Sequence, residues 1–476
     1  MKVLYASSEA RPFAASGGLA DVAGSLPRAL RNRLVGCRVV MPLYESVPQE
    51  LREGLTFLTS FSVPVAWRRQ YCGVFEAKHN GVIYYLLDNQ YYFKRAGLYG
   101  HYDDAERFAF FSRAVLEMLK YVDFKPDIIH ANDWQCALIP VYHTLFYAKE
   151  EAYSAIRTVY TIHNIQYQGK YGFEIMEDVF GLPQEARNFV EQDGCLNLMK
   201  AGIEAADRVT TVSNTYAEEI LDPWFAHGLD PILRLRQWKL TGILNGIDTV
   251  QNDPATDPAL YAPFSADDPS GKAENKRALQ ERLGLPIRAD VPLIGMVSRL
   301  ASHKGFDLVK HIQERLLEED IQMVVLGSGE WAYETFFREI YAKYPEKFCF
   351  CSGFIPELAQ KIYAAADLFL MPSQSEPCGL SQMLACRYGA VPIVRETGGL
   401  KDSIHDCGDG EGNGFTFQTY NADDMLHAIR RGLAAYADKA EWASIVDRAM
   451  RSDFSWGRSA NEYIRLYKAL LKENAK

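Results

Sequence analysis

The sequence predicts an α/β protein with two Rossmann-like domains, each built on a parallel β-sheet, that face each other across a cleft. Three observations predict this fold. The chain has 476 residues, which is too long for a single hydrophobic core. Short apolar runs alternate with longer amphipathic stretches, as strands alternate with helices in α/β proteins. Many of the short runs are continuous in Val, Ile and Leu, which is typical of parallel strands buried on both faces.

Eleven apolar runs are the expected strands, and amphipathic stretches between them, such as 106–122, are the expected helices. The runs in the N-terminal half are 3–6, 37–42, 82–88, 127–131, 158–164 and 208–213. Those in the C-terminal half are 293–298, 322–327, 347–353, 367–373 and 391–396.

A change of composition marks the domain boundary. The stretch 242–276 is rich in Asp, Pro, Ala and Gly and has little periodicity, so we interpret it as a linker and lead-in. The N-terminal domain is then 1–245 and the C-terminal domain 246–456. We expect a C-terminal helix over 457–476 to pack back onto the first domain. Open parallel sheets bind ligands beyond the carboxyl ends of their strands, so we expect the ligand site in the cleft. We also expect the cleft to close by a hinge near the domain boundary.

Composition argues against several classes of partner. The net charge of -10 disfavours nucleic acid and anionic membrane surfaces. No apolar run approaches the ~20 residues of a membrane span. The N-terminal apolar run is short and broken by polar residues, so it indicates a first strand and not a signal peptide. The nine cysteines are scattered without a CxxC pair, which indicates neither disulfides nor zinc and favours the cytoplasm.

The stretch FAASGGLADV, residues 13–22, joins the first expected strand to a helix through a glycine pair. A glycine pair before a helix N-terminus is suited to binding an anion, because backbone N–H groups can approach it closely. Such loops often add a lysine, but Ala15 and Ser16 precede the glycines here.

Polar residues also crowd the ends of other expected strands. Asp133 follows the run 127–131, and His163 and Asn164 end the run 158–164. For any one of these residues alone, the favoured interpretation is a strand cap that bonds to loop backbone. Several at one sheet edge favour a ligand site instead.

The C-terminal half carries a second group of candidates. Arg299 and Lys304 lie in one strand-to-helix loop, where they suit an anion clamp, although either alone is consistent with a surface salt bridge. Glu376 follows the run 367–373 and is suited to orienting sugar hydroxyls. A second glycine pair, 398–399, opens another helix. No D-x-D, GxGxxG or GxxxxGK[ST] pattern occurs, so we expect no metal and no dinucleotide cofactor.

These motifs together resemble bacterial glycogen synthases and plant starch synthases. The stretches that carry the resemblance, in family order from residue 1 to about 460, are SGGLADVAGSLP, HANDWQCAL, TIHNIQYQG, ILNGID, KAENK, VSRLASHKG, SEPCGLSQ, RETGGL and DFSW. The resemblance implies the two-domain glycosyltransferase B fold. It also implies transfer of glucose from ADP-glucose to the non-reducing 4-hydroxyl of an α-1,4-glucan such as glycogen, with retention and without a cofactor.

The resemblance implies a role for each candidate residue. The N-terminal domain would bind the acceptor and the C-terminal domain the nucleotide sugar. The implied catalytic residues are Asp133, His163, Arg299, Lys304 and Glu376. The implied donor-binding residues are Gly17, Gly18, Asp21, Asn164, Asn245, Cys378, Gly379, Leu380, Ser381, Thr397 and Gly398. Tyr99 would lie near the donor glucose or the acceptor.

Some positions depart from the family pattern. Ala15 stands where lysine is usual, and Gln374 and Ser375 where arginine and an aromatic residue are usual. Ser381 replaces a frequent threonine. Arg11 is a possible local substitute for the missing lysine.

Three alternatives therefore stay open: a catalytically impaired glucan-binding regulatory homologue, a transferase that prefers another donor such as UDP-glucose, and a nucleotide-sugar epimerase. The sequence does not reveal the donor base, acceptor length, regulation or oligomeric state.

Overall fold

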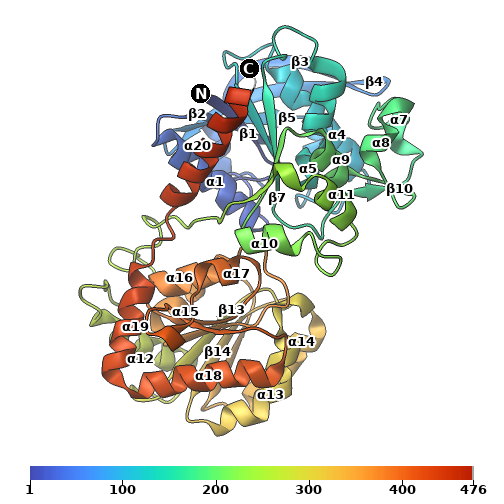
Figure 1. Ribbon diagram of the computed structural model, residues 1–476. Coiled ribbons are helices and arrows are strands. Elements are labelled where there is room, and N and C mark those ends of the chain that lie inside the picture. Colours follow the sequence, from blue (N-terminus) through green and yellow to red (C-terminus); the bar gives the residue numbers. More distant parts are fainter. Residues whose placement is uncertain (474–476) are drawn as a thin grey trace. The chain divides into compact units, whose positions relative to one another are not determined.

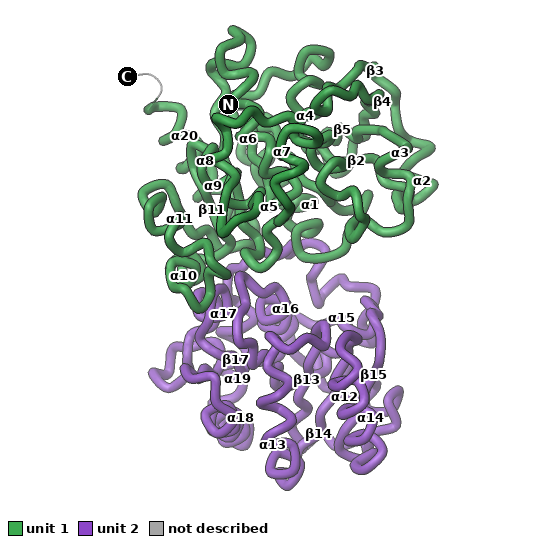
Figure 2. Tube along the Cα trace, turned by 90° about the vertical axis from the view of Figure 1, so that its right-hand side faces the viewer, with its two compact units in different colours: residues 1–245, 456–476 green, residues 246–455 purple. Residues whose placement is uncertain are grey.

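The computed structural model describes residues 1–473, and the chain forms two compact units (Figures 1 and 2). Unit 1 comprises Met1–Asn245 and the C-terminal segment from Trp456 onward, and unit 2 comprises Gly246–Ser455. The last three residues of the helix expected over 457–476 lie outside the described residues. Each unit is an α/β structure built on a largely or wholly parallel sheet, which confirms the predicted fold class.

The main sheet of unit 1 has the strand order β12-β11-β7-β6-β1-β2-β5-β4-β3. Pairing is parallel from β12 to β5, whereas β4 is antiparallel to both β5 and β3. In sheet order the strands are Leu240–Gly242, Arg208–Thr211, Arg157–Ile162, Ile128–Asn132, Lys2–Ala6, Gly36–Pro42, Val82–Asp88, Arg68–His79 and Thr56–Val65. A small antiparallel sheet joins β8 (Lys170–Tyr171), β10 (Cys195–Asn197) and β9 (Glu191–Gln192).

The apolar runs of the sequence explain which strands are central. The residues of β1, β6 and β7 are almost all buried, because both sheet faces are covered in an α/β unit. By contrast, β3 and β4 keep many exposed residues, and the apolar runs did not predict this hairpin. The helices of unit 1 are α1 (Gly18–Arg31), α2 (Gln49–Glu53), α3 (Gln90–Phe93), α4 (Asp104–Met118), α5 (Asp133–Cys136), α6 (Leu138–Tyr142), α7 (Ile175–Asp178), α8 (Arg187–Val190), α9 (Leu198–Ala205), α10 (Asn214–Glu219), α11 (Asp230–Leu235) and α20 (Trp456–Glu473).

Helix α20 returns to unit 1 and packs beside α1 (Figure 1). A buried polar contact fixes it to the sheet: Tyr467 Oη lies 2.6 Å from His130 Nδ1, and His130 Nε2 lies 2.5 Å from Thr161 Oγ1. Burial lowers the pKa of His130 to about 3, so this imidazole stays neutral and shares hydrogen bonds on both sides. The C-terminal helix is therefore part of the core of unit 1.

Unit 2 has one parallel sheet in the order β15-β14-β13-β16-β17-β18. In that order the strands are Phe348–Ser352, Gln322–Gly327, Leu293–Val297, Leu368–Met371, Val391–Arg395 and Phe415–Phe417. The helices are α12 (Gly271–Leu283), α13 (Phe306–Glu318), α14 (Trp331–Lys343), α15 (Pro356–Ala365), α16 (Ser381–Arg387), α17 (Gly398–Ser403), α18 (Ala422–Ala437) and α19 (Lys439–Arg451). Each of the eleven expected strands is present in one of the two sheets. In the described part of the chain, no helix combines the length and apolarity of a membrane span.

The KAENK motif has a structural role in unit 2. It lies in α12, so the expected linker 242–276 is too long at its C-terminal end. Lys272 Nζ donates to three backbone carbonyls, those of Ala364 at 3.0 Å, Ala366 at 2.9 Å and Tyr388 at 3.0 Å. The lysine thus caps the last turn of α15 and the turn after α16, which explains its place in the fold without any contact to a ligand.

The tether of α20 can be tested by removing one hydroxyl. Tyr467→Phe leaves the buried His130 Nδ1 without its partner, so we expect a loss of about 1–3 kcal/mol in the free energy of unfolding. Tyr160→Phe is the matched control, because Tyr160 Oη is buried without a hydrogen-bond partner among the described residues. Its removal is expected to be neutral or stabilising. Urea titrations measure the free energy of unfolding of both variants. An equal change in the two variants would contradict the tether.

Candidate functional site

In unit 1, the predicted site residues lie at the carboxyl edge of the sheet, after β1, β6 and β7. Asp133 follows β6 and has a φ of 55°, a left-handed backbone that is uncommon outside glycine. Its Oδ1 accepts a hydrogen bond of 2.8 Å from the backbone N–H of His163, which follows β7. Burial raises the pKa of Asp133 to about 7, although the N–H groups of His163 and Asn164 act in the opposite direction. A strained backbone and a raised carboxyl pKa at one position are typical of functional sites.

The side chain of His163 is oriented by Asn132, the last residue of β6. Asn132 Nδ2 donates to the carbonyls of Ala6 at 2.9 Å and His130 at 3.3 Å. These two acceptors fix the orientation of the amide, so Asn132 Oδ1 must accept the bonds that it makes, from Tyr5 Oη at 2.9 Å and His163 Nε2 at 2.9 Å. The proton of His163 is therefore on Nε2, and Nδ1 is the acceptor of the ring.

His163 is also neutral. Burial lowers its pKa to about 3, because an imidazolium would lose its hydration there. At physiological pH His163 is thus a fixed hydrogen-bonding group with an acceptor at Nδ1, and it is not a proton donor with a full positive charge.

The glycine loop connects β1 to α1, and Gly17 and Gly18 are exposed at the start of this helix. The N–H of Ser16 is already bonded, at 2.6 Å, to Oε2 of the buried Glu9, whose pKa is raised by burial. Arg11 Nε donates to Asp21 Oδ1 at 2.5 Å, and both side chains are about half exposed. The charge of Arg11 is thus paired within the loop.

Three further predicted residues of unit 1 take different positions. Tyr99 joins the group, because its hydroxyl lies 2.7 Å from Ser8 Oγ at the end of β1. Asn164 Oδ1 accepts from the N–H of Gln166 at 3.0 Å and so shapes its own turn. Asn245 follows β12 at the outer end of the sheet order, away from β1.

In unit 2, the structure brings Lys304 and Glu376 into direct contact. Lys304 Nζ lies 2.6 Å from Glu376 Oε2, and Ser373 Oγ donates to the same oxygen at 3.1 Å. Both charged side chains are largely buried, with 16% and 9% of their surface exposed. The cation assigned to the phosphate and the carboxylate assigned to the sugar therefore occupy adjacent positions at the carboxyl edge of this sheet.

The second glycine pair packs directly on the backbone that carries Glu376. A Cβ at Gly398 would lie 2.0 Å from the carbonyl oxygen of Glu376, and one at Gly399 would lie 2.0 Å from that of Cys378. The N–H of Gly399 donates to Glu376 O at 3.1 Å. Only glycine permits this approach, so Glu376, Cys378, Thr397 and Gly398 form one group.

The remaining predicted residues of unit 2 lie around this group. Arg299 follows β13 and is exposed, in the loop that also carries Lys304. Leu380 and Ser381 begin α16, after Gly379 with a φ of 69°. Where the family pattern has arginine at Gln374, the guanidinium of Arg395 donates to the carbonyl of Gln374 at 2.8 Å from the end of the neighbouring β17.

Sequence reasoning missed three residues that shape these groups. Asn132 precedes Asp133 in the chain, but only the fold shows that it is buried and bonded to His163. Glu9 is also buried, and it accepts a hydrogen bond from the N–H of Ser16 in the glycine loop. Gln382 Nε2 donates to the carbonyls of Cys378 and Gly379 at 3.0 and 2.9 Å and braces that turn. No cluster of three or more His, Cys, Asp or Glu side chains in residues 1–473 is placed to hold a metal ion.

The raised pKa of Asp133 predicts a pH-dependent stability. A carboxyl whose pKa is about 7 in the folded protein favours folding at low pH, and this contribution is lost as the pH rises from about 4 through 7. Asp133→Asn removes the titrating carboxyl and therefore the loss of stability at higher pH. Asparagine tolerates the same left-handed backbone conformation. We expect the variant to gain stability relative to the parent protein between about pH 5 and pH 7, by at most about 1.4 kcal/mol per pH unit.

Urea titrations across this pH range measure the difference in unfolding free energy. Asp123→Asn is the control, because Asp123 is an exposed aspartate of the same unit. A difference for Asp133→Asn that stays constant with pH would mean that its carboxyl titrates normally.

Two family models match the chain, one in each unit. The family model described as starch synthase catalytic domain matches residues 2–235, and the model described as glycosyl transferases group 1 matches residues 280–444. The two matches fall on unit 1 and unit 2, respectively.

Full-length relatives carry related names. The chain is 50% identical to a glycogen synthase of Geobacillus thermodenitrificans, with 99% of this chain and 98% of the relative covered. It is 49% identical to a glycogen synthase of Clostridium perfringens, with 99% of each covered. The solved catalytic domain of Starch Synthase IV from Arabidopsis thaliana, bound to ADP and acarbose, superposes with a TM-score of 0.92 at 36% identity and 99% coverage of each chain. This chain therefore belongs to the glycogen and starch synthase family of glycosyltransferases.

Proposed function

We propose that this enzyme transfers glucose from ADP-glucose to the non-reducing end of an α-1,4-glucan, with retention of the anomeric configuration. The observation that carries the proposal is the group at the carboxyl edge of unit 2. There a cation, Lys304, contacts a carboxylate, Glu376, on a turn that two glycines hold in place. A nucleoside diphosphate-glucose needs both functions side by side, one for its phosphates and one for its sugar hydroxyls. The names of the relatives support glucose and glucan as the substrates.

On the donor side, Arg299 and Lys304 would neutralise the diphosphate as it leaves. The charge on the phosphate oxygen grows as its bond to the sugar breaks, so cations placed there lower the barrier. Glu376 would accept hydrogen bonds from glucose hydroxyls, and Thr397 and Gly398 would add contacts to the phosphate from the second glycine turn. No metal ion takes part in the proposed mechanism.

On the acceptor side, the reaction would be a same-face displacement. The bond between the anomeric carbon and the phosphate oxygen breaks, and a bond to the acceptor 4-hydroxyl oxygen forms on the same face. The leaving phosphate takes the hydroxyl proton. A neutral His163 suits this chemistry, because an imidazolium would repel the positive charge that develops on the sugar. Asn132 would hold that ring in the neutral Nε2–H form.

The proposal includes the cellular setting. We infer a cytoplasmic enzyme, in agreement with nine free cysteine thiols and with the bacterial relatives. Of the alternatives, only the impaired glucan-binding homologue has a specific feature in its favour, which is the absence of a lysine at Ala15.

A transfer assay tests the function directly. We expect incubation with ADP-glucose and glycogen to lengthen the outer α-1,4 chains, with a lower rate from UDP-glucose and no loss of rate in EDTA. Incorporated label measures the rate, and digestion by an enzyme specific for α-1,4 linkages checks the product. Glucan binding without transfer from either donor would indicate the impaired homologue. Release of an epimerised sugar without acceptor would indicate an epimerase, and dependence on a divalent ion would refute the metal-free mechanism.

The pair of Lys304 and Glu376 yields a sharper prediction. Glu376→Gln keeps the size of the side chain but loses the charge, so we expect kcat to fall roughly 100-fold, as for other groups acting on a transition state. Glu346→Gln is the control, an exposed glutamate that precedes β15 at the opposite edge of the same sheet. Steady-state kinetics at saturating ADP-glucose measure the effect, and circular dichroism checks the fold. A kcat close to that of the parent enzyme would exclude Glu376 from the reaction.

A further inference from the structure

Two cysteines lie side by side on β15, the edge strand of the unit 2 sheet. Side chains alternate between the two faces of a strand, so Cys349 and Cys351 share one face. On the other face, Phe348 and Phe350 contact Phe337 of α14. The Sγ atoms of the two cysteines are 3.9 Å apart. None of the roles proposed above uses this dithiol.

The two thiols differ in their surroundings. Cys349 is buried, whereas Cys351 is partly exposed. The hydrogen bond between the two thiols lowers the pKa of Cys351 and raises the pKa of Cys349. The guanidinium of Arg282, in the last turn of α12, also lowers the pKa of Cys351, and burial acts in the opposite direction. An accessible thiol with a lowered pKa beside a second thiol is the usual arrangement of redox-sensing cysteines.

The strand β15 can accommodate a bond between these two sulfurs if its backbone bends. Cα atoms two positions apart in a strand are separated by about 6.6 Å, which is near the upper limit of about 6.8 Å for disulfides. Because β15 is an edge strand of its sheet, only β14 pairs with it, at Val324 opposite Cys349 and Leu326 opposite Cys351. A bend in β15 therefore disturbs one neighbouring strand and not two. A disulfide strained in this way is readily reduced again.

The end of β15 is joined by backbone contacts to the loop that carries Arg299. The N–H of Gly353, which follows β15, donates to the carbonyl of Gly327 at the end of β14, at 3.1 Å. A Cβ at Gly327 would lie 2.0 Å from the carbonyl oxygen of Ser298. The N–H of Ser298 in turn donates to the carbonyl of Leu326 at 3.1 Å. Because Ser298 directly precedes Arg299, a displacement at the end of β15 reaches this loop through packed backbone.

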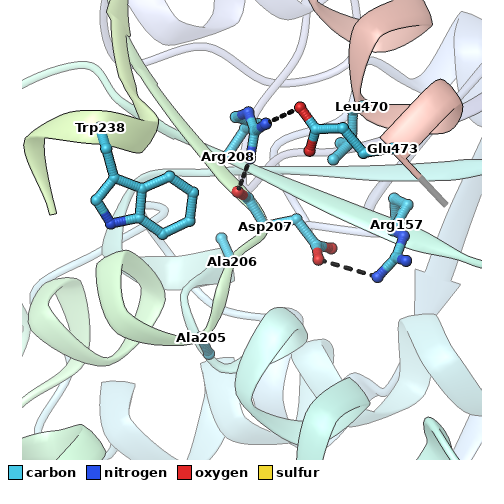
Figure 3. A pocket seen from close by; sticks show the side chains of 8 residues that line it. All are labelled: Arg157, Ala205, Ala206, Asp207, Arg208, Trp238, Leu470 and Glu473. Atoms are coloured by element: carbon cyan, nitrogen blue, oxygen red, sulfur yellow. Dashed lines mark hydrogen bonds and ion pairs between the residues drawn. The ribbon is translucent and has the colours of Figure 1, made fainter. Parts of the chain in front are cut away.

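A pocket of unit 1 offers no comparable reactive group. It has a volume of about 310 Å³ and lies at the amino ends of β7 and β11 (Figure 3). Its charged side chains bond to one another, Arg157 to Asp207 and Arg208 to Glu473. No cysteine, histidine or lysine is among its lining residues.

We propose that Cys349 and Cys351 are a site of reversible oxidation, at which a peroxide forms a disulfide and a thiol reductant removes it. In a reducing cytoplasm such a bond is transient, as redox-sensing disulfides are. Closing the bond bends the end of β15 away from β14, so the loop of Arg299 shifts and the donor binds more weakly. This last step rests on the proposed function, because Arg299 is assigned to the donor phosphates there.

The oxidation proceeds in two steps. The thiolate of Cys351 attacks one oxygen of hydrogen peroxide, the O–O bond breaks, and a sulfenic acid and a hydroxide form. The hydroxide takes a proton from solvent. The sulfur of Cys349 then attacks the sulfur of the sulfenic acid, the S–O bond breaks, and the leaving hydroxide takes the proton of the Cys349 thiol. The two cysteines together lose two electrons, and the peroxide is reduced to two waters.

Peptide mapping of the full-length protein tests the disulfide. Cleavage by trypsin after Lys347 and Lys361 releases a peptide that contains these two cysteines and no other. After treatment with hydrogen peroxide and then N-ethylmaleimide, we expect this peptide to be two hydrogens lighter and free of maleimide. Reduction by dithiothreitol before the maleimide is expected to give two adducts. Cys351→Ser is expected to abolish the disulfide. Cys195→Ser is the matched control, a partly exposed cysteine of unit 1, and is expected to leave it unchanged.

Phenylarsine oxide tests the same pair without a substitution. Its arsenic bonds to two neighbouring sulfurs and releases one water. We therefore expect it to protect the dithiol from peroxide and a small dithiol to reverse the protection. This measurement decides the proposal even if Cys351→Ser does not fold.

Steady-state kinetics measure the effect on the donor site. In the oxidised parent enzyme we expect the KM for ADP-glucose to rise about fivefold or more, a typical coupling between two sites, and to recover with dithiothreitol. Cys351→Ser treated with peroxide is expected to keep the KM of the reduced parent enzyme. Cys195→Ser is expected to respond to peroxide as the parent enzyme does.

Several outcomes would overturn the proposal. Two maleimide adducts after peroxide, a disulfide to a third cysteine, or loss of the bond in Cys195→Ser each exclude the pair. A disulfide with an unchanged KM for ADP-glucose excludes the effect on the donor site. Failure of the proposed function is seen separately: an enzyme that transfers no glucose from any donor refutes the reaction, whereas the peptide map still decides the disulfide.

Discussion

One buried amide connects the strands on which the unit 1 site depends. Asn132 bonds to Tyr5 and Ala6 of β1, to the carbonyl of His130 in its own strand, and to His163 after β7. Because each polar atom of this amide is used, its orientation is fixed, and with it the tautomer of His163. The adjacent Asp133 bonds to the backbone of His163 from the same strand end. The orientation and the tautomer of the His163 ring are thus set by a single residue that does not itself need to touch a substrate.

In unit 2, close contact between two backbone segments holds the candidate residues in place. The carbonyls of Glu376 and Cys378 lie where a Cβ of Gly398 or Gly399 would be, so two loops from different strands pack without any side chain between them. This close contact holds Glu376 beside Lys304. Two charges in a poorly hydrated position are costly when separated, so each strongly favours the presence of the other. The pair is therefore a preorganised part of the site before any ligand binds.

The sequence predicted the elements that depend on local patterns and missed those that depend on the fold. Continuous apolar runs identified the central strands, because burial on both faces leaves a clear signature. The hairpin of β3 and β4 has one face in solvent, so its sequence lacks the continuous apolar runs of a strand buried on both faces. Asp133 and Glu376 were predicted as ends of strands, but the contact of Glu376 with Lys304 spans 72 positions.

The missing lysine at Ala15 can be judged from the pairing of the cations that remain. Arg11 is bonded to Asp21, but both are about half exposed, and such a pair contributes roughly 0–1 kcal/mol. A diphosphate could therefore compete for Arg11 at little cost. Lys304 is held by Glu376 in a largely buried pair and is expensive to detach. Arg299 is exposed and has no ion pair with another described residue. In the proposed mechanism, Arg299 is therefore the cation of unit 2 that would most readily supply charge to the donor phosphates, and Arg11 is its counterpart in the glycine loop of unit 1. Lys304 would contribute its field from a fixed position, so the proposed donor chemistry does not depend on a lysine at Ala15.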